Sequence, residues 1–95
     1  MSHIDQKIPI PGPSVAARIV EGQALLLDPA ATELRRMNPV GSFVWGLIME
    51  RSHPVGNILA AVVEQFEVES SVAEADLVTF LEKLEAEGLI TYKSD

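Results

Sequence analysis

The chain has 95 residues, of which 47% are hydrophobic and 22% are charged, as expected for one globular domain with a single modest core. It contains no cysteine, which excludes disulfides and thiolate chemistry. Fourteen acidic and seven basic side chains give a formal net charge of -7, so nucleic acids and anionic membranes are disfavoured as partners.

Residues 1–14 have no periodic apolar face. They contain Pro9, Pro11, Gly12 and Pro13, which predict an extended arm that either folds back onto a sheet or hangs free. The segment lacks the basic and apolar regions of a secretory signal, and no apolar run approaches the ~20 residues that cross a bilayer. We therefore expect a cytoplasmic protein.

Three short strands are predicted next. Residues 15–20 are apolar and rich in β-branched side chains, and residues 24–28 include three consecutive leucines. Between them, Gly22 can adopt a positive φ in a tight turn. Residues 33–37 form a third strand, shorter and more charged than the other two, after a turn that begins at Asp28.

A first helix is predicted to begin at Asn38. This residue is a favoured N-cap, and Pro39 suits the first helical position. One apolar stripe then follows at Val40, Phe43, Val44, Leu47 and Ile48. The only tryptophan, Trp45, lies on the shoulder of that stripe, so we expect it to anchor the core; stacking on a ligand is the alternative.

Two further helices carry their own start and stop signals. Ser52, followed by His53 and Pro54, is expected to cap the second helix. Ser71 and Glu74 form a capping-box pattern at the start of the third, and Gly88 is a plausible C′ residue at its end. Three strands followed by three helices predict an α+β, winged-helix-like domain over residues 15–93.

The third helix has a second face besides its core stripe. At 100° per residue, five residues lie within about 80° of one another: Val72, Asp76, Thr79, Lys83 and Ala86. Most are small or only partly polar, whereas the glutamates of this helix occupy a separate sector. The face is either ordinary exposed surface with short side chains or the floor of a groove, and the pattern alone leaves both open.

Three runs carry a resemblance to a known family: "VAARIVEGQALLLDPAATELRRMNPVGSFVWGLI", "ILAAVVEQFEV" and "EADLVTFLEKLEAEGLI". In order, they hold a strand pair around a glycine turn, an aspartate-containing turn, the Met37-Asn38 step, a helical tryptophan, a Phe ending the second helix, and Ala-Asp and Leu before Gly-Leu. This ordered set resembles the PqqD family, the small peptide chaperones of pyrroloquinoline quinone biosynthesis. The resemblance covers roughly residues 15–90.

The resemblance implies a recognition element for ribosomally made, modified peptides. Such a protein captures the leader segment of a precursor peptide and presents it to a modifying enzyme, such as a radical SAM protein, a peptidase or a cyclase. The leader would add as a strand to the third strand and lie against the third helix. The implied peptide-binding residues are Glu33, Leu34, Arg35, Arg36, Met37, Val72, Asp76, Thr79, Phe80 and Lys83.

Charged residues in this set have two interpretations. Arg35 and Arg36 either guard an open strand edge against aggregation or meet an acidic leader residue. Lys83 would assist in the second case, and Asp76 would accept a hydroxyl or a cation from the peptide. The family often has an aromatic or aliphatic residue at the position of Arg35, and an acidic residue at that of Gly56.

Other classes of function fit less well. A DNA-binding winged helix would read bases with its third helix, which here has five acidic residues and Lys83 alone as a cation. His3 and His53 lack an identifiable partner acid or nucleophile and are too few for a metal site, so we expect no enzyme activity, catalytic residue, metal or cofactor. A generic protein-interaction module or assembly subunit remains the alternative, and a homodimer through the open edge is left open.

Overall fold

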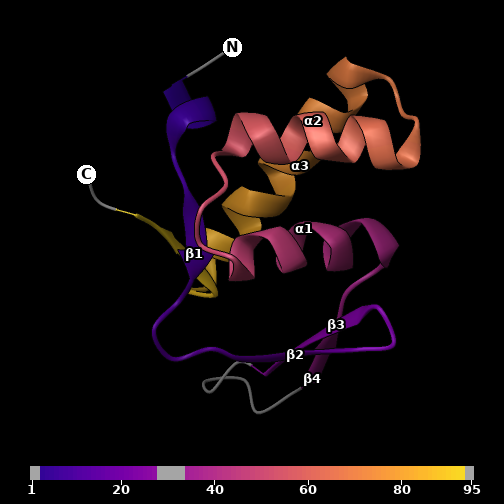
Figure 1. Cartoon of the computed structure of the whole chain (residues 1–95). Helices are drawn as coiled ribbons and strands as arrows, with labels where there is room; N and C mark the ends of the chain where they lie inside the picture. The colour runs from indigo at the N-terminus through magenta and orange to yellow at the C-terminus, as the bar shows by residue number, and fades with distance from the viewer. Residues whose placement is uncertain (1–2, 28–33, 94–95) are drawn as a thin grey trace.

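The computed structural model describes residues 3–27 and 34–93 (Figure 1). The elements in chain order are the 3-10 helix η1 (His3–Gln6), β1 (Pro9–Pro11), β2 (Ala16–Val20), β3 (Gln23–Leu27), β4 (Leu34–Arg36), α1 (Pro39–Met49), α2 (Val55–Phe66), α3 (Ser70–Ala86) and β5 (Ile90–Tyr92). Within the described residues, the sheet β2-β3-β4 and the three helices confirm the predicted α+β class. None of the helices found there is long and apolar enough to cross a membrane.

The three-stranded sheet is antiparallel, with β3 in the centre and β2 and β4 at its borders. Glu21 and Gly22 connect β2 to β3 with φ values of 52° and 80°, which confirms the positive φ expected at Gly22. The third strand, expected over residues 33–37, is observed at Leu34–Arg36. Glu33 lies outside the described residues.

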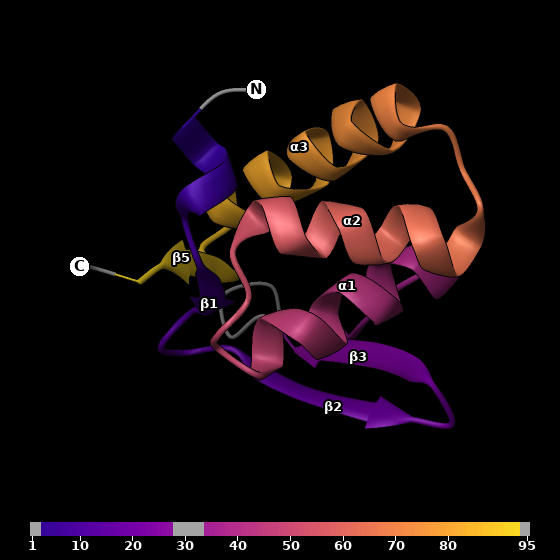
Figure 2. The same cartoon turned by 45° about the horizontal axis from the view of Figure 1, so that its top comes forward.

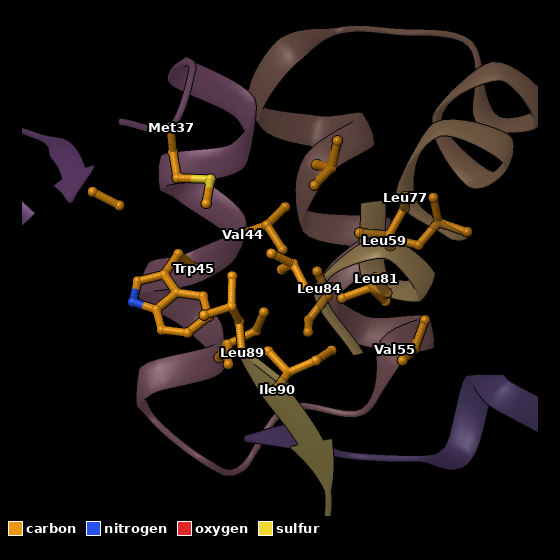
Figure 3. Close-up of a cluster of buried hydrophobic side chains, with 14 of the residues drawn as sticks. Met37, Val44, Trp45, Val55, Leu59, Leu77, Leu81, Leu84, Leu89 and Ile90 are labelled. Atoms are coloured by element: carbon orange, nitrogen blue, oxygen red, sulfur yellow. The ribbon is translucent and has the colours of Figure 1, made fainter. Parts of the chain in front are cut away.

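Helix α1 lies between this sheet and α2, as both views show (Figure 1 and Figure 2). It contacts β3 on one side and α2 on the other, while α2 also packs on α3. A helix in this position must be apolar on more than one face, which explains why the shoulder of its stripe is buried too. Trp45 is fully buried in the resulting core, confirming its expected role (Figure 3).

The start of α1 follows its local sequence. The Asn38 side-chain oxygen accepts a hydrogen bond of 2.7 Å from the Gly41 amide, and Pro39 is the first helical residue. The end of α3 does so as well, since Gly88 has a φ of 76° and the Leu89 amide donates to the Leu84 carbonyl. Both predicted signals are confirmed.

The two other helix starts differ from expectation. Ser52 does not cap α2: the helix begins at Val55 after Pro54, and the Val55 amide donates to the Lys7 carbonyl at 2.9 Å. The capping box of α3 is also not formed. That helix starts at Ser70, so Ser71 lies inside the first turn, and its hydroxyl donates to the Glu69 carboxylate at 2.5 Å.

The N-terminal segment is folded onto α2 and β5. β1 pairs antiparallel with β5, and η1 packs on α2. At the end of β1, Gly12 donates to the Leu89 carbonyl at 2.9 Å, and a Cβ at Gly12 would collide with the Gly88 carbonyl oxygen. β1 tolerates two prolines because it has a single neighbour and forms a sheet edge. Its partner residue Tyr92 is half-buried; burial raises the pKa of the Tyr92 phenol, and the carboxylates of Glu85 and Glu82 add to the shift.

Candidate functional site

The outer edge of β4 is the first component of the candidate site. β4 hydrogen-bonds to β3 on one side, and within residues 3–27 and 34–93 no other strand pairs with it. β1, in the N-terminal arm, pairs with β5 and not with this edge. The border of the three-stranded sheet therefore offers main-chain donors and acceptors over Leu34–Arg36.

Met37 delimits this edge. Its side chain is 8% exposed and belongs to the core. Its amide donates to the Ala24 carbonyl at 3.0 Å, while its carbonyl accepts from the Ser42 hydroxyl and the Gln23 amide side chain. Because these backbone groups already have partners, the pairing edge expected over 33–37 is reduced to 34–36 among the described residues.

Ser42 holds this end of the sheet against α1. It is a buried polar residue, and its hydroxyl accepts a hydrogen bond of 2.9 Å from the Ala24 amide. The same hydroxyl donates to the Met37 carbonyl at 3.3 Å. One side chain thus joins β3, the end of β4 and α1, which positions the free edge relative to the helices.

A cavity of about 440 Å³ opens beside the start of α1 and extends along α3. Its walls are formed by residues from α1, α2, the α2–α3 connection and α3: Asn38, Val40, Gly41, Val44, Val62, Phe66, Val68, Val72, Ala73, Asp76, Leu77, Thr79, Phe80 and Lys83. Most of these side chains are apolar. Polar and charged groups are contributed mainly by α3, together with Asn38.

The cavity is lined by all five α3 residues that were predicted to bind a peptide, namely Val72, Asp76, Thr79, Phe80 and Lys83. Val72 is 52% exposed, and it lines the cavity together with two other exposed valines, Val40 and Val68. Asp76 and Lys83 are also exposed, and they lie two helical turns apart. The second face of α3, which the sequence left as either exposed surface or a groove floor, therefore lines the cavity. Ala86 is the one residue of that face that is not among the lining residues.

The cavity walls on α1 and α2 were not predicted from the sequence. Gly41 lines the cavity, and a Cβ there would lie 3.4 Å from the Phe80 ring and 3.1 Å from the Asn38 side-chain oxygen. Phe66 and Val68, at the end of α2, also line it. In the local sequence, only the glycine at position 41, one turn before Trp45, indicated that another element approaches α1 closely.

The two arginines of β4 point to opposite faces of the sheet. Arg35 pairs with the buried Leu26 and shares its helix-facing side, whereas Arg36 pairs with Leu25 on the outer side and is exposed. The Arg35 guanidinium forms an ion pair with Glu87, the C-cap residue of α3. Arg36 thus lies exposed on the outer face of the sheet, while Arg35 connects the edge strand to the C-terminal end of α3.

His53 pairs with a carboxylate on the surface. The His53 ring lies in the connection between α1 and α2, 2.6 Å from the carboxylate of Glu50, the C-cap residue of α1. Among residues 3–27 and 34–93, no group of three or more His, Cys, Asp and Glu side chains is arranged to hold a metal ion. The described site consists of a strand edge, an apolar hollow and a few charges.

The sequence also matches the model of a known protein family. The sequence model of "Coenzyme PQQ synthesis protein D (PqqD)" matches residues 23–90. The chain belongs to the PqqD family. The matched segment runs from the start of β3 into β5, and so includes the β4 edge and all three helices that line the cavity.

A solved structure is also similar to the structure of this chain. "TbiB1 in Complex with the TbiA(beta) Leader Peptide" superposes with a TM-score of 0.78 at 24% sequence identity, covering 90% of this chain and 99% of that one. At this identity the similarity establishes the shared fold. A search of curated protein sequences finds no match.

Proposed function

We propose that this PqqD-family protein binds the leader segment of a ribosomally made precursor peptide and presents it to a modifying enzyme. In this proposal the leader adds as a strand to β4 and lies against α3. The observation that carries it is the outer edge of β4, which has no strand partner among the described residues, together with a largely apolar cavity of about 440 Å³ whose lining includes Asn38, two residues after β4. The similar TbiB1 structure, which holds a leader peptide, supports the same ligand class.

Strand addition suits these two features because they supply different parts of the binding energy. The main chain of β4 would provide hydrogen bonds to any extended peptide, largely irrespective of its sequence. Side chains that alternate toward the helices would then enter the cavity, where Val72 and Phe80 offer apolar surface. Affinity would come mainly from the edge, and selectivity from the cavity.

The free protein must keep the same edge from pairing with other chains. β4 is only three residues long, and exposed Arg36 lies within it. Short edge strands and charged side chains are both common protections against aggregation. An acidic protein also repels copies of itself at neutral pH, which favours a monomer that waits for a peptide.

A titration with candidate leader peptides tests the proposal. The probes are synthetic peptides that cover the leader of any short precursor encoded next to the gene of this chain. Amide resonances of residues 34–36 and 76–83 should shift on binding, and calorimetry should give a 1:1 complex. Shifts centred instead on β2 or on the β1–β5 pair would contradict the proposed site.

Two matched variants make this test specific. Val72→Arg places a long charged side chain at the cavity mouth and should weaken peptide binding by about tenfold or more. Val20→Arg makes the same change at a residue that is similarly exposed, 46% against 52%, but lies at the end of β2 away from the cavity, and should leave the affinity unchanged. Equal losses in both variants would argue against the cavity as the binding site.

A protein-interaction module of the same fold is the alternative function. The outer face of the sheet gives it some support, since Leu27 and Leu34 form an exposed cross-strand pair there. Such a module would bind a folded partner and ignore isolated leader peptides. A homodimer through β4 would instead appear as a concentration-dependent mass in sedimentation analysis, and added peptide would dissociate it.

A further inference from the structure

The register of the sheet determines which side of a bound peptide would face Arg35. Ala17, Leu26 and Arg35 form one cross-strand row on the helix-facing side. If a fourth strand pairs with β4, as the proposed function requires, its residue opposite Arg35 continues this row. The Cβ atoms of directly opposed residues lie about 5 Å apart, so that peptide side chain would lie next to Arg35 and toward α3.

The chain itself already places charges at that point. The Arg35 guanidinium is paired with the Glu87 carboxylate, and both side chains are about one-third exposed, 30% and 35%. Lys83 lies one turn before Glu87 on α3 and lines the cavity. Within the described parts of the chain, no ion pair engages Lys83. Arg35 is thus paired with one carboxylate, and a second cation, Lys83, lies one helical turn from that carboxylate.

We propose that the groove selects a peptide with Asp or Glu opposite Arg35, and that this residue replaces Glu87 as the partner of Arg35. In the free protein, Glu87 occupies the place of the peptide carboxylate. In the complex, the incoming carboxylate would contact Arg35 and lie within reach of Lys83. Glu87, at the exposed C-terminal end of α3, would turn into solvent.

Exchange of one carboxylate for another explains why the selectivity should be moderate. The Arg35–Glu87 pair is partly exposed, and such pairs contribute little net energy, so breaking it costs little. The gain comes from the second cation, Lys83, and from the cross-strand position of the new carboxylate. An opposite-charge pair in that position predicts a preference for Glu over Gln of about two- to fivefold in Kd.

Other charges near the groove do not predict the same preference. Arg36 is on the outer face of the sheet and cannot reach a side chain that faces α3. Asp76 is two helical turns from Lys83, toward the start of α3, and would repel an acidic residue at its own end of the cavity. The requirement for an acid is therefore confined to one register position of the peptide.

The test selects a phage-displayed library of random peptides on the wild-type protein and on Arg35→Gln. Peptides enriched on the wild type should share an acidic residue at a constant spacing from an apolar one, and this acid should be lost from peptides enriched on Arg35→Gln. One enriched peptide is then synthesised with Glu or with Gln at that position. Calorimetry should give a Kd ratio of about two to five for the wild type and about one for Arg35→Gln.

Two more variants separate this effect from damage to the fold. Glu87→Gln removes the intramolecular competitor, so it should bind the Glu peptide more tightly than the wild type does and leave the Gln peptide unchanged. A gain of affinity cannot result from partial unfolding. Arg36→Gln is the matched control on the outer face, and it should leave the Glu-to-Gln ratio as in the wild type.

The outcomes distinguish this inference from the function on which it rests. Peptides that perturb the amides of residues 34–36 but show no preference for an acid would overturn the inference and leave leader binding standing. A preference that is abolished by Arg36→Gln and kept by Arg35→Gln would overturn the inference in the same way. A library that yields no peptide binding at β4 would overturn both.

Discussion

At the scale of single residues, α1 holds a side chain that supports the site without lining it. Trp45 is fully buried and is not among the residues of the cavity. Its indole Nε1 is also buried, and no hydrogen-bond partner for it lies within the described residues. An unpaired donor costs free energy, so the hydrophobic area of the ring must outweigh it. Trp45 thus acts through packing.

Replacing this side chain should affect stability far more than ligand contact. We expect Trp45→Ala to lower the free energy of unfolding by about 3–5 kcal/mol, measured by urea denaturation, because it leaves a large cavity behind α1. Met49→Ala, at an exposed apolar residue near the end of the same helix, should change it by less than about 0.5 kcal/mol.

The milder variant Trp45→Phe tests whether the ring has a role in binding. It should remain folded, and any leader peptide bound by the wild type should bind it with the same affinity. A loss of affinity in a fully folded Trp45→Phe protein would contradict the assignment of Trp45 to the core and restore a ligand-stacking role.

At the scale of elements, some helix ends are determined by residues within the same turn, and others by hydrogen bonds from segments far away in the sequence. Asn38 and Gly88 act within their own turns, and both behave as their sequence patterns predict. The first amide of α2 is satisfied by the Lys7 carbonyl from the arm, so no side-chain cap is needed at Ser52. A backbone N–H group can donate to any suitably placed acceptor. When that acceptor is a carbonyl from a distant segment, the sequence near the helix start carries no sign of it.

The arm approaches the turn between α3 and β5 closely at Gly12. Gly12→Ala would force β1 away from β5, because the added Cβ would collide with the Gly88 carbonyl oxygen. We expect a loss of about 1–3 kcal/mol in stability by thermal unfolding. Hydrogen exchange of the Lys93 amide, which donates to the Ile8 carbonyl at 2.8 Å, should become faster.

Gly46→Ala is the matched control. Gly46 lies inside α1, and its added Cβ would make an ordinary contact of 3.7 Å with the Ile19 side chain of β2. Alanine is favoured over glycine in a helix interior by about 1 kcal/mol, so this variant should be equally or more stable than the wild type. Equal destabilisation by both variants would mean that the contact between Gly12 and Gly88 is unimportant.

At the scale of the whole molecule, charge separates this protein from DNA-binding domains with a similar order of elements. The net charge is -7, and α3, which would be the reading helix, exposes Glu82 and Glu85 and ends at Glu87. DNA affinity depends on cations that neutralise phosphates, and these carboxylates would face them instead.

We therefore expect no change in fluorescence anisotropy when the protein is added to a labelled DNA duplex at low salt. A doubly substituted protein, Glu82→Lys with Glu85→Lys, should gain weak binding that disappears as salt is added. Salt-dependent binding of the duplex by the wild-type protein would revive a role in DNA recognition.

Much of this protein could be predicted from its sequence. Hydrophobic periodicity and turn residues predicted the three strands of the main sheet, the three helices, the core position of Trp45 and which α3 residues share a face, because these depend on neighbours within one or two turns. The resemblance to the family was carried by the ordered set of motifs in three runs of the sequence. The tertiary structure alone decided that this face lines a cavity with Gly41 and Phe66, that Arg35 pairs with Glu87, and that the arm covers β5 and leaves β4 unpaired among the described residues. The physical reason is that an ion pair, a cavity wall or a strand partner joins segments far apart along the chain, and residue spacing carries no information about which distant surfaces meet.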